Sequence, residues 1–170
     1  MSTRWLSEQT VLLIQDAVRT NISQALVDVR TQRNDAKVQT DPPQSYFIYE
    51  GARGYRCPAI FTIIDSMEML NADRGANHIN ARAHVIVAVL VEDRIQTNLT
   101  YKAWRYQSAL HNVLHQTVLT SSDNRVKLVV KVDRIVFGPE FSESTDTNKP
   151  SGVFRKEVAL HLEVEHYESF

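Results

Sequence analysis

Residues 125–166, RVKLVVKVDRIVFGPEFSESTDTNKPSGVFRKEVALHLEVEH, decide the fold of this chain. Two runs within this stretch alternate strictly between apolar and polar side chains. The apolar positions are Val126, Leu128, Val130 and Val132 in the first run and Val158, Leu160, Leu162 and Val164 in the second. Side chains of a strand point alternately to opposite faces, so a period of two predicts two strands that each have one face on a core. We expect these strands to pair as a hairpin.

The segment between the two runs, Gly138 to Gly152, is bounded by glycines and filled with Ser, Thr, Asp and Glu. Hairpin loops usually have ~2 to 5 residues, and longer ones are either functional or disordered. We therefore predict that residues 138–152 form a mobile loop in the isolated chain, which becomes ordered only against a neighbouring protein.

Length and composition favour one intracellular domain over residues 1–170. The charges, 19 basic against 20 acidic residues, nearly cancel, which argues against a general nucleic-acid-binding or membrane-binding surface. A single cysteine, Cys57, excludes an internal disulfide and a cysteine-rich zinc site, and it fits a reducing cytoplasm. We expect no signal peptide and no membrane span, because no apolar run approaches ~18 residues.

The N-terminal part of the chain has the pattern of a long helix. Its apolar stripe recurs at steps of three and four residues and consists of Val11, Ile14, Val18, Ile22, Ala25 and Val29. Leu12 and Leu13 lie off that stripe, so we expect this helix to contact something besides its own sheet. Residues 31–45 are polar and contain Pro42 and Pro43, which predicts an irregular linker.

Three further strands are predicted, over residues 46–49, 59–64 and 79–91, with residues 71–77 as the turn that makes the last two a hairpin. The second face of the third strand becomes apolar at its end, at Ile86, Ala88 and Leu90. A second amphipathic helix is expected over residues 99–117, with Thr97 or Asn98 as its N-cap. This order of elements predicts an α+β domain: a mostly antiparallel sheet, two main helices packed on one face, and a long final β-hairpin.

The sequence contains no convincing site for chemistry. His111 and His115 have the i, i+4 spacing of two metal ligands, but no Glu follows the first His and no third ligand is evident. The glycines of residues 51–54 are followed by neither the Gly-Lys-Ser/Thr of a phosphate loop nor the aromatic pattern of an RNA-binding strand. No carboxylate, serine or cysteine stands in an activating context. We therefore expect no enzyme activity, no cofactor and no metal.

The second helix points instead toward contact. At ~100° per residue, Trp104, Ser108, His111 and His115 form a flank turned away from the apolar stripe. We expect Trp104 to be covered either by the Pro42–Pro43 linker or another loop of its own chain, or by another protein, since Trp is enriched at protein contacts.

One stretch carries a resemblance to a known family. Residues 81–118 comprise a strand ending in VIVAVLVED, a polar break, and the helical sequence LTYKAWRYQSALHNVLHQTV. Together with the long first helix and the final hairpin, this order of elements resembles the tail-terminator, or tail-completion, proteins of long-tailed bacteriophages. The likeness spans most of the chain and includes no diagnostic motif. The irregular segment from Thr31 to Pro58 departs from the family pattern.

The resemblance implies a structural virion protein without catalysis, a homo-hexameric ring at the head-proximal end of the tail tube. Such a ring ends tube polymerisation and joins tail to head. Its implied partners are its own copies, the tail tube, a sheath protein where the tail has one, and the head connector or neck protein, with DNA only as cargo passing through. The protein would assemble in the bacterial host cytoplasm and reside in the virion, in the tail or neck.

Other readings stay open. Related neck and head-completion connectors share much of the pattern, and a nucleic-acid- or partner-binding module or a small enzyme of unknown chemistry are further alternatives. The candidate residues for a subunit or partner interface are Leu12, Leu13, Trp104, His111, His115 and Phe141.

Overall fold

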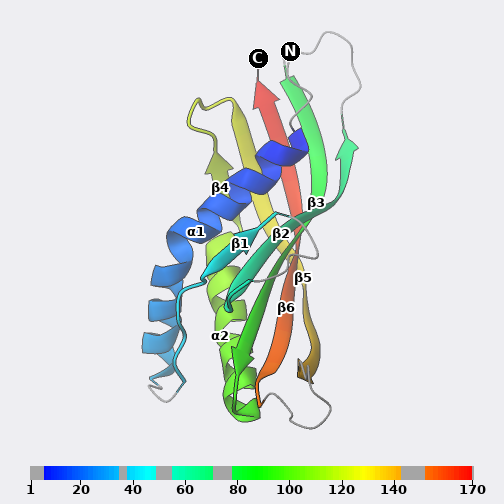
Figure 1. The fold of residues 1–170 in the computed structure, drawn as a ribbon. Helices are drawn as coiled ribbons and strands as arrows, with labels where there is room; N and C mark the ends of the chain where they lie inside the picture. Colours follow the sequence, from blue (N-terminus) through cyan, green and yellow to red (C-terminus); the bar gives the residue numbers. More distant parts are fainter. Residues whose placement is uncertain (1–5, 35–37, 49–54, 71–77, 143–151, 170) are drawn as a thin grey trace.

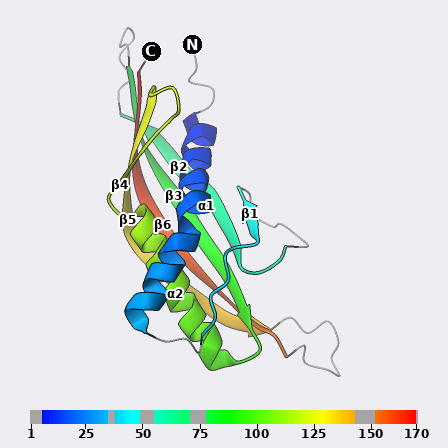
Figure 2. The ribbon, with the colours of Figure 1, turned by 90° about the vertical axis from the view of Figure 1, so that its left-hand side faces the viewer.

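The computed structural model describes residues 6–34, 38–48, 55–70, 78–142 and 152–169 as a six-stranded sheet with two helices (Figure 1). The helices are α1 (Leu6–Arg33) and α2 (Gln96–Leu114), and they pack against each other on one face of the sheet. In Figure 2 both helices lie in front of the sheet. The predicted α+β class and the segregation of the helices to one face are confirmed.

The sheet has the strand order β1-β2-β3-β6-β5-β4. The strands are β1 (Ser45–Phe47), β2 (Ala59–Met69), β3 (His78–Asp93), β4 (Thr117–Thr120), β5 (Val126–Ser142) and β6 (Phe154–Ser169). Only β1 runs parallel to its neighbour; all other pairs are antiparallel. Both predicted hairpin pairings, β2 with β3 and β5 with β6, are present.

The core lies between the helices and the helix-facing side of the sheet, where the predicted apolar stripes meet. Ile14, Val18 and Ile22 of α1 and Leu110 of α2 are fully buried in it. The opposite face of β3 is also apolar at its end, as predicted, because Ala88 and Leu90 are buried there.

Aromatic side chains gather on that helix-free face, next to the buried end of β3. Phe61, which pairs with Ala88 across the strands, stacks on Phe47 at 5.3 Å between ring centroids. Tyr55 meets Phe61 edge-on at 5.8 Å. This cluster accounts for burial on a side of the sheet that carries no helix.

The strand β5 extends to Ser142, well beyond Val132, where its alternating apolar pattern ends. Gly138–Ser142, expected in the loop, belong to β5, so the prediction of a loop from 138 is wrong at its start. Two bulges, between Val132 and Arg134 and between Phe137 and Glu140, interrupt the pairing with β6 and reset the alternation, which hid the strand from a period-two pattern. Residues 143–151 lie outside the described part of the chain, and their predicted mobility stays a prediction.

The helix ends also differ from expectation. α1 continues to Arg33, so the first residues of the predicted 31–45 linker are helical. The N-cap of α2 is Ile95, not Thr97 or Asn98, and no side chain caps it; Asp93 Oδ1 instead accepts the Ile95 N–H at 2.8 Å. α2 ends at Leu114, and the positive φ of Gln116 turns the chain into β4, a strand that the sequence did not predict.

Candidate assembly surfaces

His111 and His115 lie side by side at the C-terminal end of α2. Their rings stack at 4.5 Å between centroids, and partial burial together with the neighbouring His115 lowers the pKa of His111. No group of three or more His, Cys, Asp or Glu side chains suited to a metal occurs among the described residues.

His115 contacts the sheet, although the sequence placed it on a flank of the helix that faces away from the core. Its Nδ1 accepts the backbone N–H of Val132 at 3.3 Å, just beyond the last pairing of β4 with β5, Thr117 with Val130. The side chain therefore satisfies an edge amide of β5 next to the start of β4.

Trp104 faces outward, as predicted, with 43% of its surface exposed. It meets Tyr101 edge-on at 5.6 Å, and the two rings line a cavity of about 210 Å³ with Arg33 and Arg105. Tyr101 and Trp104 together are called the helix surface below.

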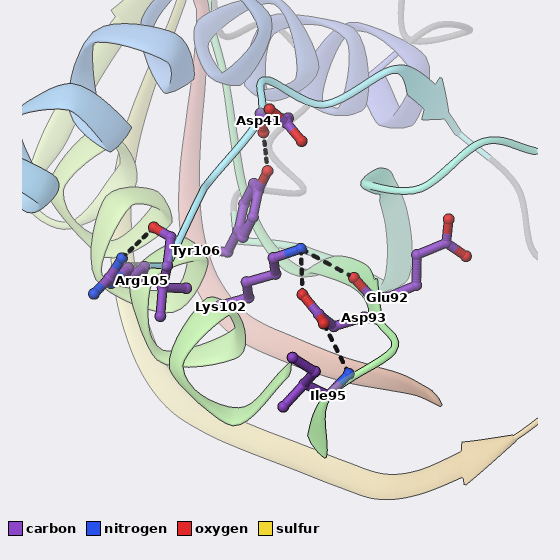
Figure 3. A network of polar contacts seen from close by, with 8 residues as sticks. Asp41, Glu92, Asp93, Ile95, Lys102, Arg105 and Tyr106 are labelled. Atoms are coloured by element: carbon purple, nitrogen blue, oxygen red, sulfur yellow. Dashed lines mark hydrogen bonds and ion pairs between the residues drawn. The ribbon is translucent and has the colours of Figure 1, made fainter. Parts of the chain in front are cut away.

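Polar contacts from Arg105 and Tyr106 of α2 hold the segment that precedes Pro42 and Pro43 (Figure 3). Arg105, which is buried, donates from Nη1 to the carbonyl oxygen of Val38 at 2.5 Å. The Tyr106 hydroxyl donates to the carbonyl oxygen of Asp41, and burial raises the pKa of this phenol. With the segment held by these contacts, Trp104 remains exposed.

The start of α2 is fixed to the end of β3 by charge. Lys102 Nζ lies 2.7 Å from Asp93 Oδ2 and donates to the carbonyl oxygen of Glu92 at 3.3 Å (Figure 3). Partial burial would raise the pKa of Asp93, but the hydrogen bonds from Lys102 and the Ile95 N–H hold it below the usual value. Beside this network lies a cavity of about 270 Å³, lined in part by Gln44, Cys57 and Lys102.

The two leucines of α1 differ in exposure. Leu12 is 38% exposed, whereas Leu13 is partly buried and packs against the core. Of the two, only Leu12 is a surface residue available to a partner.

The far end of β5 carries exposed apolar side chains. Phe141, a predicted interface residue, is exposed, and so are Val136 and Phe137. Val136 and Phe137 follow one another in the strand and pair with Ala159 and Val158, so they lie on opposite faces of the sheet at this end. The three residues together are called the strand surface below. The sequence analysis missed Val136 and Phe137, because the bulges on both sides of them hide the alternation of the strand.

Both sides of the sheet also end in strand edges that are only partly covered (Figure 1). β4 covers β5 only from Lys127 to Val130, and β5 continues to Ser142. On the other side β1 covers β2 only from Ala59 to Phe61, and β2 continues to Met69. Within the described residues, no strand pairs with the remaining edge of either β5 or β2. An edge is open where a strand extends beyond its neighbour. The open edges were not predicted, because the ends of β2 and β5 were predicted several residues too early.

No helix in the described residues is long and apolar enough to span a membrane. No protein-family model matches the chain, and no curated protein sequence matches it. Among the solved structures, the chain is similar to one chain from a structure described as "Virion of native gene transfer agent (GTA) particle", with 12% sequence identity and a TM-score of 0.40. The similarity covers 89% of this chain and 97% of that chain.

Proposed function

We propose that this protein is a non-catalytic structural subunit of a phage-type virion and acts as a tail terminator, a hexameric ring at the head-proximal end of the tail tube. The order of elements, a long helix, a hairpin, a second helix and a long final hairpin, supports the proposal through its resemblance to that family.

The observation that carries the proposal is that one subunit presents several different unpartnered surfaces. A closed cyclic ring needs two unlike patches per subunit, one meeting the other around the axis, and a ring that joins tail to head needs further contacts above and below. The helix surface, the strand surface and the two open edges of the sheet supply these patches on separate elements.

Two carboxylates at the end of β3 are engaged by neighbouring side chains and backbone, which supports a structural role for them. Asp93 is held by Lys102 and the Ile95 N–H, and Glu92 Oε2 lies 3.2 Å from Arg155 Nε. Catalytic acids and bases need a free position in reach of a substrate, and these two side chains fix α2 and β6 to the end of β3.

Tail-tube assembly tests the proposal. Adding the purified protein to polymerising tube subunits of the same virus should stop growth, so that electron micrographs show shorter tubes with extra density at one end only. Unchanged tube lengths with bare ends would contradict the terminator role. Binding to the head connector without any effect on tubes would favour a neck or head-completion connector in its place.

A further inference from the structure

The open edges of β5 and β2 lie on opposite sides of the same sheet. Among the strands of the described residues, none pairs with β5 from Asp133 to Ser142, beyond the Val132 N–H that His115 accepts. None of them pairs with β2 from Thr62 to Met69 on the side of β1, beyond the stretch that β1 covers. An open edge carries unpaired backbone N–H and C=O groups and is a template for another strand.

Both edges also carry exposed apolar side chains, which are unfavourable on a strand edge that contacts only water. They are Val136 and Phe137 on β5, and Met69 with the following Leu70 on β2. Natural sheets protect open edges with lysines, prolines and bulges. The chain has bulges in both strands and Pro139 in β5, but the residues between the two β5 bulges, 134–137, end in Ile-Val-Phe.

The strand directions match a head-to-tail contact. From β2 to β3, β6 and β5 each step is antiparallel, so β2 and β5 run in opposite directions. Copies related by rotation about one axis keep the same direction along that axis. The β5 edge of one copy therefore meets the β2 edge of the next as an antiparallel pair, the geometry that the rest of this sheet uses.

The free segments are staggered along the strands. Through Val87 and Leu160, Thr62 of β2 lies level with Ile135 of β5, and through Val85 and Leu162, Ile64 lies level with Val132. The middle of the free β2 segment is therefore displaced by about four residues from residues 134–137, or ~13 Å at ~3.3 Å per residue.

This stagger has the size that a closed sheet requires. One subunit contributes four strand spacings from its β2 to the next copy's β2, or ~19 Å at ~4.8 Å each. A shift of ~13 Å over ~19 Å tilts the strands by about 35°, at the lower end of the ~35–45° tilt of strands in closed barrels. A flat, unstaggered contact would instead bring Val136 and Phe137 to the level of Phe61 and Ile60, which β1 already covers.

We propose that the free edge of β5 in one subunit pairs antiparallel with the free edge of β2 in the next copy of this chain, joining the sheets of neighbouring subunits into one closed sheet. This inference rests on the proposed ring and names the contact that closes it. An isologous pairing of β5 with β5 would leave every β2 edge open, whereas the heterologous contact uses both edges in every subunit.

Two matched double variants test the pairing, since lysines are how natural sheets discourage edge contacts. The β5-edge variant is Val136→Lys/Phe137→Lys and the β2-edge variant is Ser66→Lys/Glu68→Lys, in the free β2 segment that the stagger sets against residues 134–137; all four side chains are exposed. The control, Val27→Lys/Ile95→Lys, places two lysines at exposed apolar positions at and near the helices, away from both edges. Circular dichroism and melting temperature close to wild type establish that each variant is folded.

We expect the wild type and the control to form rings in native mass spectrometry, and each edge variant alone to be monomeric. An equimolar mixture of the two edge variants at high concentration should give a one-to-one heterodimer and nothing larger, because one intact β5 edge and one intact β2 edge remain to meet. Rings formed by either edge variant, or a mixture that stays monomeric, would overturn the edge pairing and leave the ring itself standing. A wild type that is monomeric and does not act on tail tubes would overturn the proposed function as well.

Discussion

His166 is fully buried at the end of β6, and a hydroxyl on α1 is its partner. Thr10 donates from Oγ1 to the Leu6 carbonyl oxygen at 2.8 Å, so at 2.9 Å from His166 Nδ1 it accepts the ring N–H. The His166 Nε2 has no partner among the described residues, and protonating it would bury an unpaired charge. Burial accordingly lowers the pKa of His166 to about 4.

The lowered pKa of His166 predicts a stability that falls with acidification. The unfolded imidazole has a pKa of ~6.5, so between about pH 6.5 and pH 4 the unfolded chain binds the extra proton and the folded chain does not. Stability from this group is complete above pH ~6.5 and is lost as the pH falls toward 4. Glu168, whose pKa burial raises, acts in the opposite direction.

Urea unfolding of the His166→Gln variant measures this effect. We expect its free energy of unfolding to change less between pH 7 and pH 4.5 than that of the wild type. His84→Gln, at an exposed position on the other face of the sheet, is the control and should keep the wild-type slope. Equal slopes for wild type and His166→Gln would contradict the assignment.

We expect alanine substitutions of His111 and His115 to change the free energy of unfolding by different amounts. His115→Ala should lower the free energy of unfolding by about 0.5–1.5 kcal/mol, because the Val132 N–H loses its acceptor. His111→Ala should change it by less than about 0.5 kcal/mol. A separate prediction is that the purified wild type contains no stoichiometric zinc. Zinc that is present in the wild type and absent from the His111→Ala/His115→Ala double variant would show that the two histidines bind metal.

At the scale of elements, regular alternation was readable from the sequence and irregular ends were not. The apolar stripe of α1 and the alternating runs of β5 and β6 located these elements, because burial on one face imposes the helical or strand period. Bulges in β2 and β5 break that period, so the far ends of both strands were missed. The start of α2 was misplaced because its first turn is held by Asp93 and not by a capping side chain of its own.

The helix α1 gives a test that separates folding from assembly. Leu12→Asp changes an exposed side chain and should alter stability by less than about 0.5 kcal/mol. Leu13→Asp places a charge against the core and should cost about 2 kcal/mol or more, so it cannot report cleanly on assembly. Chemical denaturation of both variants checks this order, and rings formed as readily by Leu12→Asp as by wild type would exclude Leu12 from the interface.

At the scale of the whole molecule, the candidate surfaces were only partly predictable. Trp104 was predicted to face outward because it stood off the apolar stripe of its helix, and Phe141 because it was the main large apolar residue of a predicted loop; both are exposed. The open edges could not be found in this way, since an edge is a property of strand order and of unequal strand lengths. The short strands β1 and β4, which leave those edges uncovered, have too few residues to show a period.

The native mass of the purified wild-type protein tests the central claim most directly. The account predicts one closed species of six copies of the 19.4 kDa chain, or about 116 kDa, whose mass does not grow with concentration because a closed ring leaves no free edge. A protein that stays at 19.4 kDa at every concentration, or that forms only dimers, would contradict the account.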